Sequence, residues 1–239
     1  MATLTFLGTG NYLVKGRYWS NLLIDGTVLV ETAPTALPHL RRLGVGADQL
    51  DAIVVSHFHP DHTFGWPFLL LELMLAGRER PLHVVGPPDT EGFFAEMMAL
   101  GGVPDVHEQA HSALDIRYVE VDGTWQDAGP VRFRAVEVDH VPHLRCFGYL
   151  FDRGDRIVGY SGDVHPCPGL DELAAGADVL VLECNGAHPW PTHMDIGSVR
   201  ELRERFPDVP FLLTHVGDDV DPTGIPDVVL PSDFDVLEV

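Results

Sequence analysis

The chain has 239 residues and a formal net charge of −21 at pH 7, with 15 Lys and Arg against 36 Asp and Glu. A field of this sign repels polyanions, and no cluster of Lys and Arg is visible, so a long nucleic acid is not an expected partner. Apolar residues make up 45% and charged residues 21%, which is typical of a soluble globular protein and argues against long disordered tracts. We expect a single domain over residues 1–239.

The cysteines and the N-terminal residues bear on the cellular compartment. Cys146, Cys167 and Cys184 are odd in number and form no C-x-x-C pair, which suits a reducing compartment. The first residues, MATLTFLGTG, lack the basic and apolar regions of a secretory signal. The longest apolar run begins at Trp66, is too short to cross a bilayer and contains Glu72. These features predict a cytoplasmic protein without a membrane partner.

Apolar runs of strand length recur along the chain and are interrupted by helical patterns. In chain order the expected strands are TLTFLG, NLLID, TVLVE, DAIVVS, PLHVVG, DIRYVEV, VRFRAVEV, CFGYLF, RIVGYS, DVLVLE and PFLLTH, and FDVLEV can add a last one. The expected helices are TALPHLRRLG, PFLLLELMLAG, DTEGFFAEMMALGG, GLDELAAGA and DIGSVRELRERF, while residues 11–20, 101–114 and 185–194 are expected to be loops. Because strands outnumber helices without a regular βαβ alternation, the pattern predicts a layered α/β (α+β) fold of two sheets with helices on their outer faces.

The segment SHFHPDHTFG, residues 56–65, concentrates metal-binding side chains directly after the apolar run DAIVVS. His57 and His59 are two positions apart, so in extended backbone they face the same way and can bind one ion. Pro60 favours an extended conformation at His59, and Asp61 and His62 can then point at a second site. Nitrogen and oxygen donors in this mixture suit zinc, with manganese or iron as alternatives. The density of donors after a buried strand predicts a metal site at the rim of a sheet.

The order of these donors, H-x-H-x-D-H, resembles the signature of the metallo-β-lactamase superfamily of binuclear hydrolases. Further residues follow in the order that the family shows: His140 after AVEVD, Asp163 in GYSGD, Glu183 in ADVLVLE and His215 in FLLTH. The resemblance implies a four-layer αββα sandwich of two mixed β-sheets flanked by helices, with the site at one edge. It also implies two divalent metal ions, Zn²⁺ in the first place and Mn²⁺ or Fe as alternatives.

The same resemblance implies how the ligands divide between the two ions. One ion is expected on His57, His59 and His140, the other on Asp61, His62 and His215, with Asp163 bridging them. The third histidine of the first set is open between two residues of DHVPHLRCFGY. His140 ends a strand and is preferred over His143. Asp139 is a candidate acceptor for a ligand imidazole.

Within the superfamily the chain is most similar to the branch that contains ribonuclease Z and related phosphodiesterases. FLGTG, GPPDT, GY before SGD, and LTH carry this likeness. His193, in PTHMDIGSV, matches a histidine of that branch implicated in protonating the leaving group, and His188 competes for this role. The chain departs from known members of the superfamily in three places. Asp163 stands where true β-lactamases commonly use cysteine. Compared with ribonuclease Z, residues 101–114 are too short and not basic enough to form the arm that binds RNA, and LVETAPTAL replaces an Asp-Gly-rich stretch. Antibiotic hydrolysis and transfer RNA processing are therefore not expected.

These observations predict a metal-dependent hydrolase, specifically a phosphodiesterase for a small or cyclic phosphodiester. Two dications about 3.5 to 4 Å apart lower the pKa of a shared water to about 7, which gives a bridging hydroxide as nucleophile. Asp61 or Asp163 can orient it, and His193 can protonate the leaving oxygen. The expected partner is an anionic small molecule, and the resemblance also allows a homodimer. The alternatives are a carboxylic ester, lactone or thioester hydrolase on the same metals, or a metal-binding accessory protein without catalysis.

Overall fold

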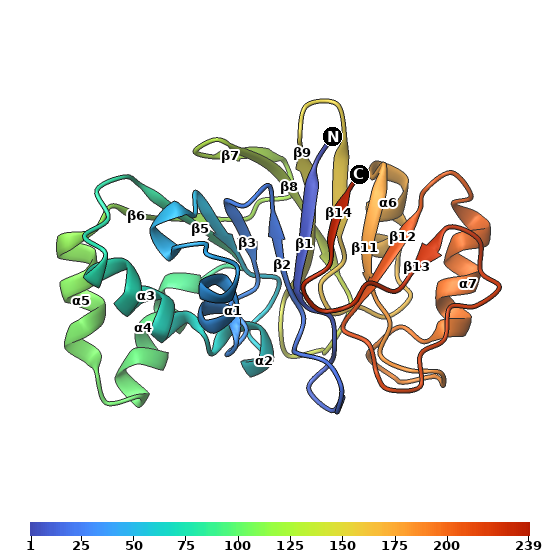
Figure 1. The fold of residues 1–239 in the computed structure, drawn as a ribbon, viewed down its shortest axis with the longest axis horizontal. Coiled ribbons are helices and arrows are strands. Elements are labelled where there is room, and N and C mark those ends of the chain that lie inside the picture. Colours follow the sequence, from blue (N-terminus) through green and yellow to red (C-terminus); the bar gives the residue numbers. More distant parts are fainter.

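Two mixed sheets of seven strands each pack face to face in the computed structural model, which describes residues 1–239 (Figure 1). The strands of the first sheet, in spatial order, are β14 (Val236–Glu238), β1 (Thr3–Gly8), β2 (Asn21–Ile24), β3 (Val28–Val30), β4 (Ala52–Val54), β5 (Leu82–Gly86) and β6 (Ile116–Glu120). Those of the second are β13 (Val228–Val229), β12 (Phe211–Thr214), β11 (Val179–Glu183), β10 (Ile157–Tyr160), β9 (Cys146–Asp152), β8 (Val131–Val138) and β7 (Trp125–Ala128).

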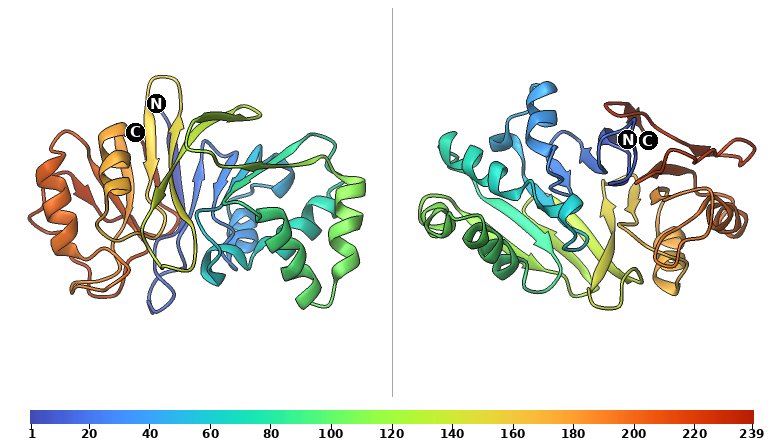
Figure 2. Two further views of the ribbon diagram at one scale, coloured as in Figure 1. Left: turned by 180° about the vertical axis from the view of Figure 1, so that it is seen from behind. Right: turned by 90° about the horizontal axis from the view of Figure 1, so that it is seen from below.

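Helices cover the outer face of each sheet. The first sheet carries α1 (Ala36–Arg42), a 3₁₀ turn (Ala47–Gln49), α2 (Pro60–Thr63), α3 (Trp66–Leu75), α4 (Thr90–Leu100) and α5 (Pro104–Ala113), and the second carries α6 (Pro168–Gly176) and α7 (Ile196–Arg205). The two helical layers lie on opposite sides of the paired sheets (Figures 1 and 2). This arrangement confirms the predicted four-layer αββα sandwich. None of the helices is both long and apolar enough to span a bilayer.

Three apolar clusters hold the layers together. The central one joins the inner faces of the two sheets and contains Phe6 from β1 and Phe133 and Phe151 from the second sheet. The second lies between the first sheet and its helices, and the third lies between the second sheet and α6 and α7. Strand β11 is buried along its whole length, which explains its unbroken apolar run, because a strand covered on both faces has no solvent side.

Strand direction brings several loops to one edge of the sandwich. In the second sheet β10, β11 and β12 are mutually parallel, and β8 runs the same way because both β8 and β10 are antiparallel to β9. In the first sheet β3, β4 and β5 are parallel. The carboxyl ends of parallel strands meet at a common edge, which is where open α/β sheets hold their ligands.

The structure departs from the sequence-based expectations at several elements. Residues 101–114, expected to be a loop, contain helix α5, and β7 and the short elements α2 and β13 were not anticipated. Helix α5 buries only Ala110 within its length, so its sequence lacks the apolar periodicity that would reveal a helix. The optional last strand, FDVLEV, does form: β14 pairs with β1 and brings the two chain ends together.

Candidate metal centre

The structure brings together all seven residues that the sequence suggested as metal ligands. They enter from five places: His57 and His59 after β4, Asp61 and His62 in α2, His140 after β8, Asp163 after β10 and His215 after β12. They form two groups, His57, His59, His140 and Asp163 in one and Asp61, His62 and His215 in the other, each with ligand atoms within 4.8 Å of one another. His143 and His188 are exposed and belong to neither group.

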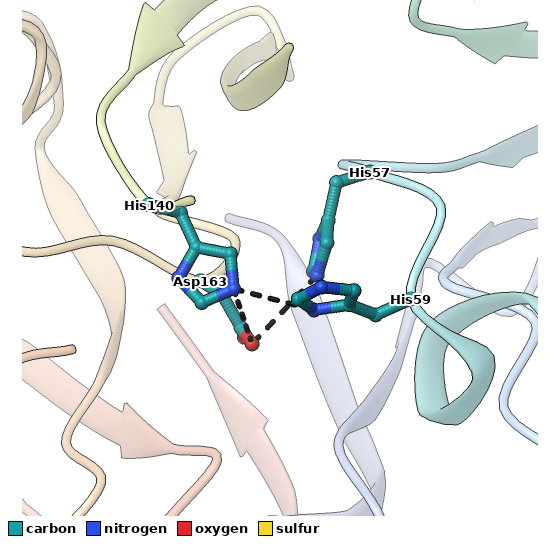
Figure 3. Close-up of side chains that lie close together, drawn as sticks. All are labelled: His57, His59, His140 and Asp163. Carbon is teal, nitrogen blue, oxygen red and sulfur yellow. Dashed lines mark hydrogen bonds and ion pairs between the residues drawn. The ribbon is translucent and has the colours of Figure 1, made fainter. Parts of the chain in front are cut away.

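The first group converges on Asp163 (Figure 3). Nε2 of His57 and Nε2 of His140 each lie 3.8 Å from Oδ2 of Asp163. Nε2 of His140 also lies 3.3 Å from Nδ1 of His59. Three imidazoles and one carboxylate oxygen thus face a common point, and His140 rather than His143 supplies the third ring.

The second group shares the same carboxylate. Nε2 of His62 lies 3.5 Å from Oδ2 of Asp61 and 3.4 Å from Oδ1 of Asp163. Nε2 of His215 lies 3.5 Å from Oδ2 of Asp61 and 3.5 Å from Oδ2 of Asp163. Asp163 therefore lies between the two groups, and its carboxylate faces both.

Oxygen atoms behind the imidazoles fix how the rings are turned. Nδ1 of His57 is 2.8 Å from the Ser56 hydroxyl, and Nδ1 of His140 is 2.7 Å from the carbonyl oxygen of Thr192. An acceptor on one ring nitrogen leaves the lone pair of the other directed inward, as in metal-binding histidines generally. Asp139, suggested from sequence as such an acceptor, is exposed, and Thr192 takes this role for His140.

Two buried glutamates lie behind the rings of the second group and face their outer nitrogens, and sequence reasoning assigned neither of them a role. Oε1 of Glu31 lies 3.5 Å from Nδ1 of His62, and Oε2 of Glu183 lies 3.7 Å from Nδ1 of His215. Both glutamates are completely buried, and each follows or ends an apolar strand run. The sequence feature that could have identified them is a carboxylate at the end of a buried strand, because such a group needs a cationic or hydrogen-bonding partner.

Several nitrogen and oxygen atoms of the two groups lack hydrogen-bond partners, which is consistent with binding of divalent ions. Nε2 of His57, His62 and His215 and Oδ1 of Asp163 face the cluster, are buried and have no hydrogen-bond partner in the protein. Buried polar groups of this kind are costly unless something satisfies them. Imidazole nitrogens and carboxylate oxygens that converge in this way suit zinc and similar ions.

Burial lowers the pKa of each histidine in the first group, whereas the electrostatics of the second group favour positive charge. Burial raises the pKa of Asp163, but His215 and His62 lower it well below its usual range. Burial lowers the pKa of His215, but Asp163, Asp61 and Glu183 together raise it to about 10. The carboxylates around His215 therefore favour a positive charge at this position.

Unusual backbone conformations occur at three positions around the cluster. Glu31 and His215 have φ of 69° and 51°, in the left-handed region that non-glycine residues rarely adopt. Gly162, with φ of 61°, brings the turn before Asp163 so close to Ser56 that a Cβ atom would lie 2.8 Å from the Ser56 Cβ. Strained residues held by their surroundings often mark functional sites.

His193 reaches the cluster from the loop before α7. Its Nδ1 lies 2.8 Å from Oε1 of Glu183 and 4.0 Å from Oδ2 of Asp163, and its ring stacks on that of His215 with centroids 5.3 Å apart. Burial lowers the pKa of His193, but the Glu183 carboxylate raises it, and the net pKa lies above the usual value. Glu183 itself is fixed by the backbone N–H of Val164, which donates to Oε1 over 2.6 Å.

A cavity of about 470 Å³ opens onto the cluster. It is lined by Tyr12, Trp19, Pro34, His59, Pro60, Asp61 and Phe64. Tyr12 and Phe64 are 56% and 48% exposed, which leaves their rings free to contact a bound molecule. The lining contains aromatic and apolar side chains beside two of the candidate ligands, and no Lys or Arg.

An aromatic contact supports the ligand segment from the opposite side. Phe58, between His57 and His59, stacks on Phe93 of α4 with ring centroids 4.3 Å apart and planes inclined by 8°. Residues that alternate along extended backbone point to opposite sides, so the phenyl ring faces the helices while the two imidazoles face the cluster.

Comparison with known proteins gives the family. Residues 21–216 match the model of the beta-lactamase superfamily domain. The chain is 33% identical over 195 residues to the protein named ribonuclease Z from Mycobacterium marinum (strain ATCC BAA-535 / M), covering 76% of this chain and 70% of the relative. It is likewise 33% identical over 195 residues to the ribonuclease Z of Mycobacterium avium (strain 104), covering 76% and 69%.

Solved structures share the fold at lower identity. A diphosphatase of the PhnP family superposes with a TM-score of 0.78 at 21% identity, covering 100% of this chain and 98% of the other. The metallo-beta-lactamase fold protein YhfI from Bacillus subtilis gives 0.80 at 18% identity, covering 99% and 98%. The short form of human tRNase Z gives 0.75 at 21% identity, covering 99% and 98%. The family model and the ribonuclease Z relatives show that the chain belongs to the beta-lactamase superfamily, in its ribonuclease Z-like branch. The protein is a metal-dependent hydrolase.

Proposed function

We propose that this protein is a metal-dependent phosphodiesterase that cleaves a small or cyclic phosphodiester. The observation that carries the proposal is the pair of ligand groups sharing Asp163 beside a cavity, with His193 held against Glu183 at the same place. Relatives named ribonuclease Z and a diphosphatase of the same fold support phosphate ester chemistry.

In this proposal two divalent ions are held by the two groups. His57, His59 and His140 would hold one ion, Asp61, His62 and His215 would hold the other, and Asp163 lies beside both groups. When bound, such a pair polarises the phosphoryl group and activates water for attack. Zinc is the first expectation from the histidine-rich donor set, with manganese and iron as alternatives.

The protein supplies orientation and a proton. Glu183 accepts a hydrogen bond from Nδ1–H of His193, which turns Nε2 of the same ring away from Glu183 and makes it the atom that gives a proton to the departing oxygen. Asp61 lies at the cavity wall and is 14% exposed, so its carboxylate can also orient the attacking group.

The cavity favours a compact substrate with an aryl group or a nucleobase. The aromatic rings of Tyr12, Trp19 and Phe64 can stack on an aryl group or on any nucleobase. A polynucleotide would also need cationic side chains along its phosphate backbone. The cavity lining offers no Lys or Arg, and the whole chain carries a net charge of −21. The substrate charge is therefore met locally, at the ions.

The same cavity favours one alternative, a carboxylic ester, lactone or thioester hydrolase. A largely apolar lining accepts an uncharged substrate as readily as a monoanion.

A substrate panel separates the two functions. The zinc-loaded and manganese-loaded proteins are assayed on bis(p-nitrophenyl) phosphate, 2′,3′-cyclic nucleoside phosphates, p-nitrophenyl esters and lactones. Turnover of the phosphodiesters supports the proposal. Turnover of esters or lactones alone, with either metal, would replace it by the alternative.

A further inference from the structure

A second group of metal-binding side chains lies outside the catalytic cluster, between α4 and α5. Glu91 of α4 and His107 and His111 of α5 bring one potential ligand atom each within 4.8 Å of the others. Nε2 of His111 lies 3.8 Å from Oε1 of Glu91. The two histidines are four residues apart on one helix, so their rings share a face, with centroids 4.2 Å apart. Helix α5 forms the outer edge of the molecule on this side (Figure 1).

The protein holds the His111 ring in a metal-binding orientation. Nδ1 of His111 donates to the carbonyl oxygen of His107 over 2.8 Å, which places the proton on Nδ1 and leaves the lone pair of Nε2 towards Glu91. Tyr118 of β6 stacks on the same ring, with centroids 5.6 Å apart and planes inclined by 9°. The ring therefore has a fixed tautomer and a packed face.

Unpartnered polar atoms provide an independent sign of a ligand here. Nδ1 of His107 and Nε2 of His111 are buried and have no hydrogen-bond partner in the protein. Buried polar atoms of this kind destabilise the fold unless something satisfies them. A cation that accepts both lone pairs and the Glu91 carboxylate would satisfy these atoms at once.

We propose that Glu91, His107 and His111 bind a third divalent transition-metal ion, of the zinc, nickel or copper class. Two imidazoles and a carboxylate suit these ions better than magnesium or calcium, which prefer oxygen donors. The side chains of His111 and Glu91 are 24% and 57% exposed, so an ion can reach them from solvent.

The position of this group suggests what the ion does. It ties α5 to α4, and α4 carries Phe93, which stacks on Phe58 between two of the catalytic ligands. The ion thus stabilises the helical layer on which the catalytic segment rests, without contacting the catalytic cluster. This site depends on neither the substrate nor the reaction proposed above.

Metal stoichiometry tests the proposal directly. The wild-type protein, the double variant His107→Gln/His111→Gln and the control Glu108→Gln are stripped with a chelator and dialysed against micromolar free zinc. Zinc per chain is then measured by plasma mass spectrometry. Glu108 is an exposed carboxylate of the same helix outside the group, so its removal lowers the local negative charge without touching a ligand. We expect the double variant to hold one zinc fewer than both the wild type and Glu108→Gln.

The same loss of one zinc is expected when the variants are compared in a His59→Ala background, where the catalytic cluster is damaged. Equal zinc contents in all proteins would overturn the proposal, as would an equal loss in Glu108→Gln, which would indicate non-specific attraction. If circular dichroism shows that the double variant is misfolded, Glu91→Gln replaces it, because an exposed side chain can be changed without disturbing the core. A dissociation constant for the third zinc about tenfold higher in Glu91→Gln supports the site, and an unchanged one refutes it.

Discussion

Replacing His193 by Ala tests the proposed proton donor. Nδ1 of His193 lies 2.8 Å from Oε1 of Glu183 and 4.0 Å from Oδ2 of Asp163. Because Glu183 already accepts a hydrogen bond from Nδ1, we assign the proton transfer to Nε2. A positioned general acid contributes about 10²-fold to 10⁴-fold in rate, or about 3 to 5 kcal/mol of barrier. We therefore expect kcat to fall by about this factor for a substrate whose leaving group is an alkoxide.

The assay compares two leaving groups. The alkoxide expelled from a 2′,3′-cyclic nucleoside phosphate needs a proton, whereas p-nitrophenolate departs without one. The His193→Ala variant should thus lose about 10²-fold to 10⁴-fold on the cyclic substrate but less than about tenfold on bis(p-nitrophenyl) phosphate. The metal content should stay at the wild-type value. His188→Ala, an exposed histidine of the same loop, serves as the matched control and should leave both rates unchanged.

Equal losses on the two substrates would refute the role of His193 as an acid. Loss of metal from the variant would point instead to a ligand, since His193 also lies with Asp163 and His215 in a group whose ligand atoms are within 4.8 Å of one another. Glu183→Gln keeps the hydrogen-bonding shape but removes the charge, and we expect it to give a smaller loss with the same dependence on the leaving group.

Three further predictions concern the cluster, the cavity and the core. His59→Ala should lose both bound metal and hydrolysis, measured by metal analysis and turnover, whereas a non-catalytic accessory protein would show no turnover even in the wild type. Phe64→Ala should raise KM for aryl phosphodiesters about fivefold to tenfold with little change in kcat. Stacking on an aromatic ring contributes about 1 to 3 kcal/mol, and the lower part of this range applies because the Phe64 ring is partly exposed. An unchanged KM would show that the aryl group binds elsewhere. Tyr149→Phe removes the hydroxyl that donates to the carbonyl oxygen of Val55 over 2.7 Å. A buried acceptor left unsatisfied costs about 1 to 3 kcal/mol, so calorimetry should show a Tm lower by about 2 to 12 °C.

The candidate ligands were accessible from the sequence because they share a simple arrangement. An apolar run marks a buried strand, and the polar residue directly after it lies at the rim of the sheet. His57, His140 and His215 all follow such runs, at β4, β8 and β12. Their gathering at one edge then depends only on strand direction, which the family resemblance supplied.

The residues behind the ligands were not accessible in the same way. Glu31 and Glu183 end or follow apolar runs too, but a carboxylate there has many uses. Only the packing of the sheets shows that Glu31 lies behind His62 and that Glu183 serves both His215 and His193. Helix α5 was missed for a related reason: its role is to carry polar residues on the outer surface, so it has little apolar pattern to read.

The stack of Phe58 on Phe93 has a consequence for how this enzyme can vary. Phe58, which separates two candidate ligands, also packs their segment against α4 through this stack. A smaller side chain at Phe58 or Phe93 would let the segment that carries His57 and His59 move towards α4. Replacing both rings by a pair of equal total volume would keep this segment in place. Substitutions at these two positions are therefore expected to be energetically coupled, and a matched pair of changes offers a way to shift the candidate ligands without replacing any of them.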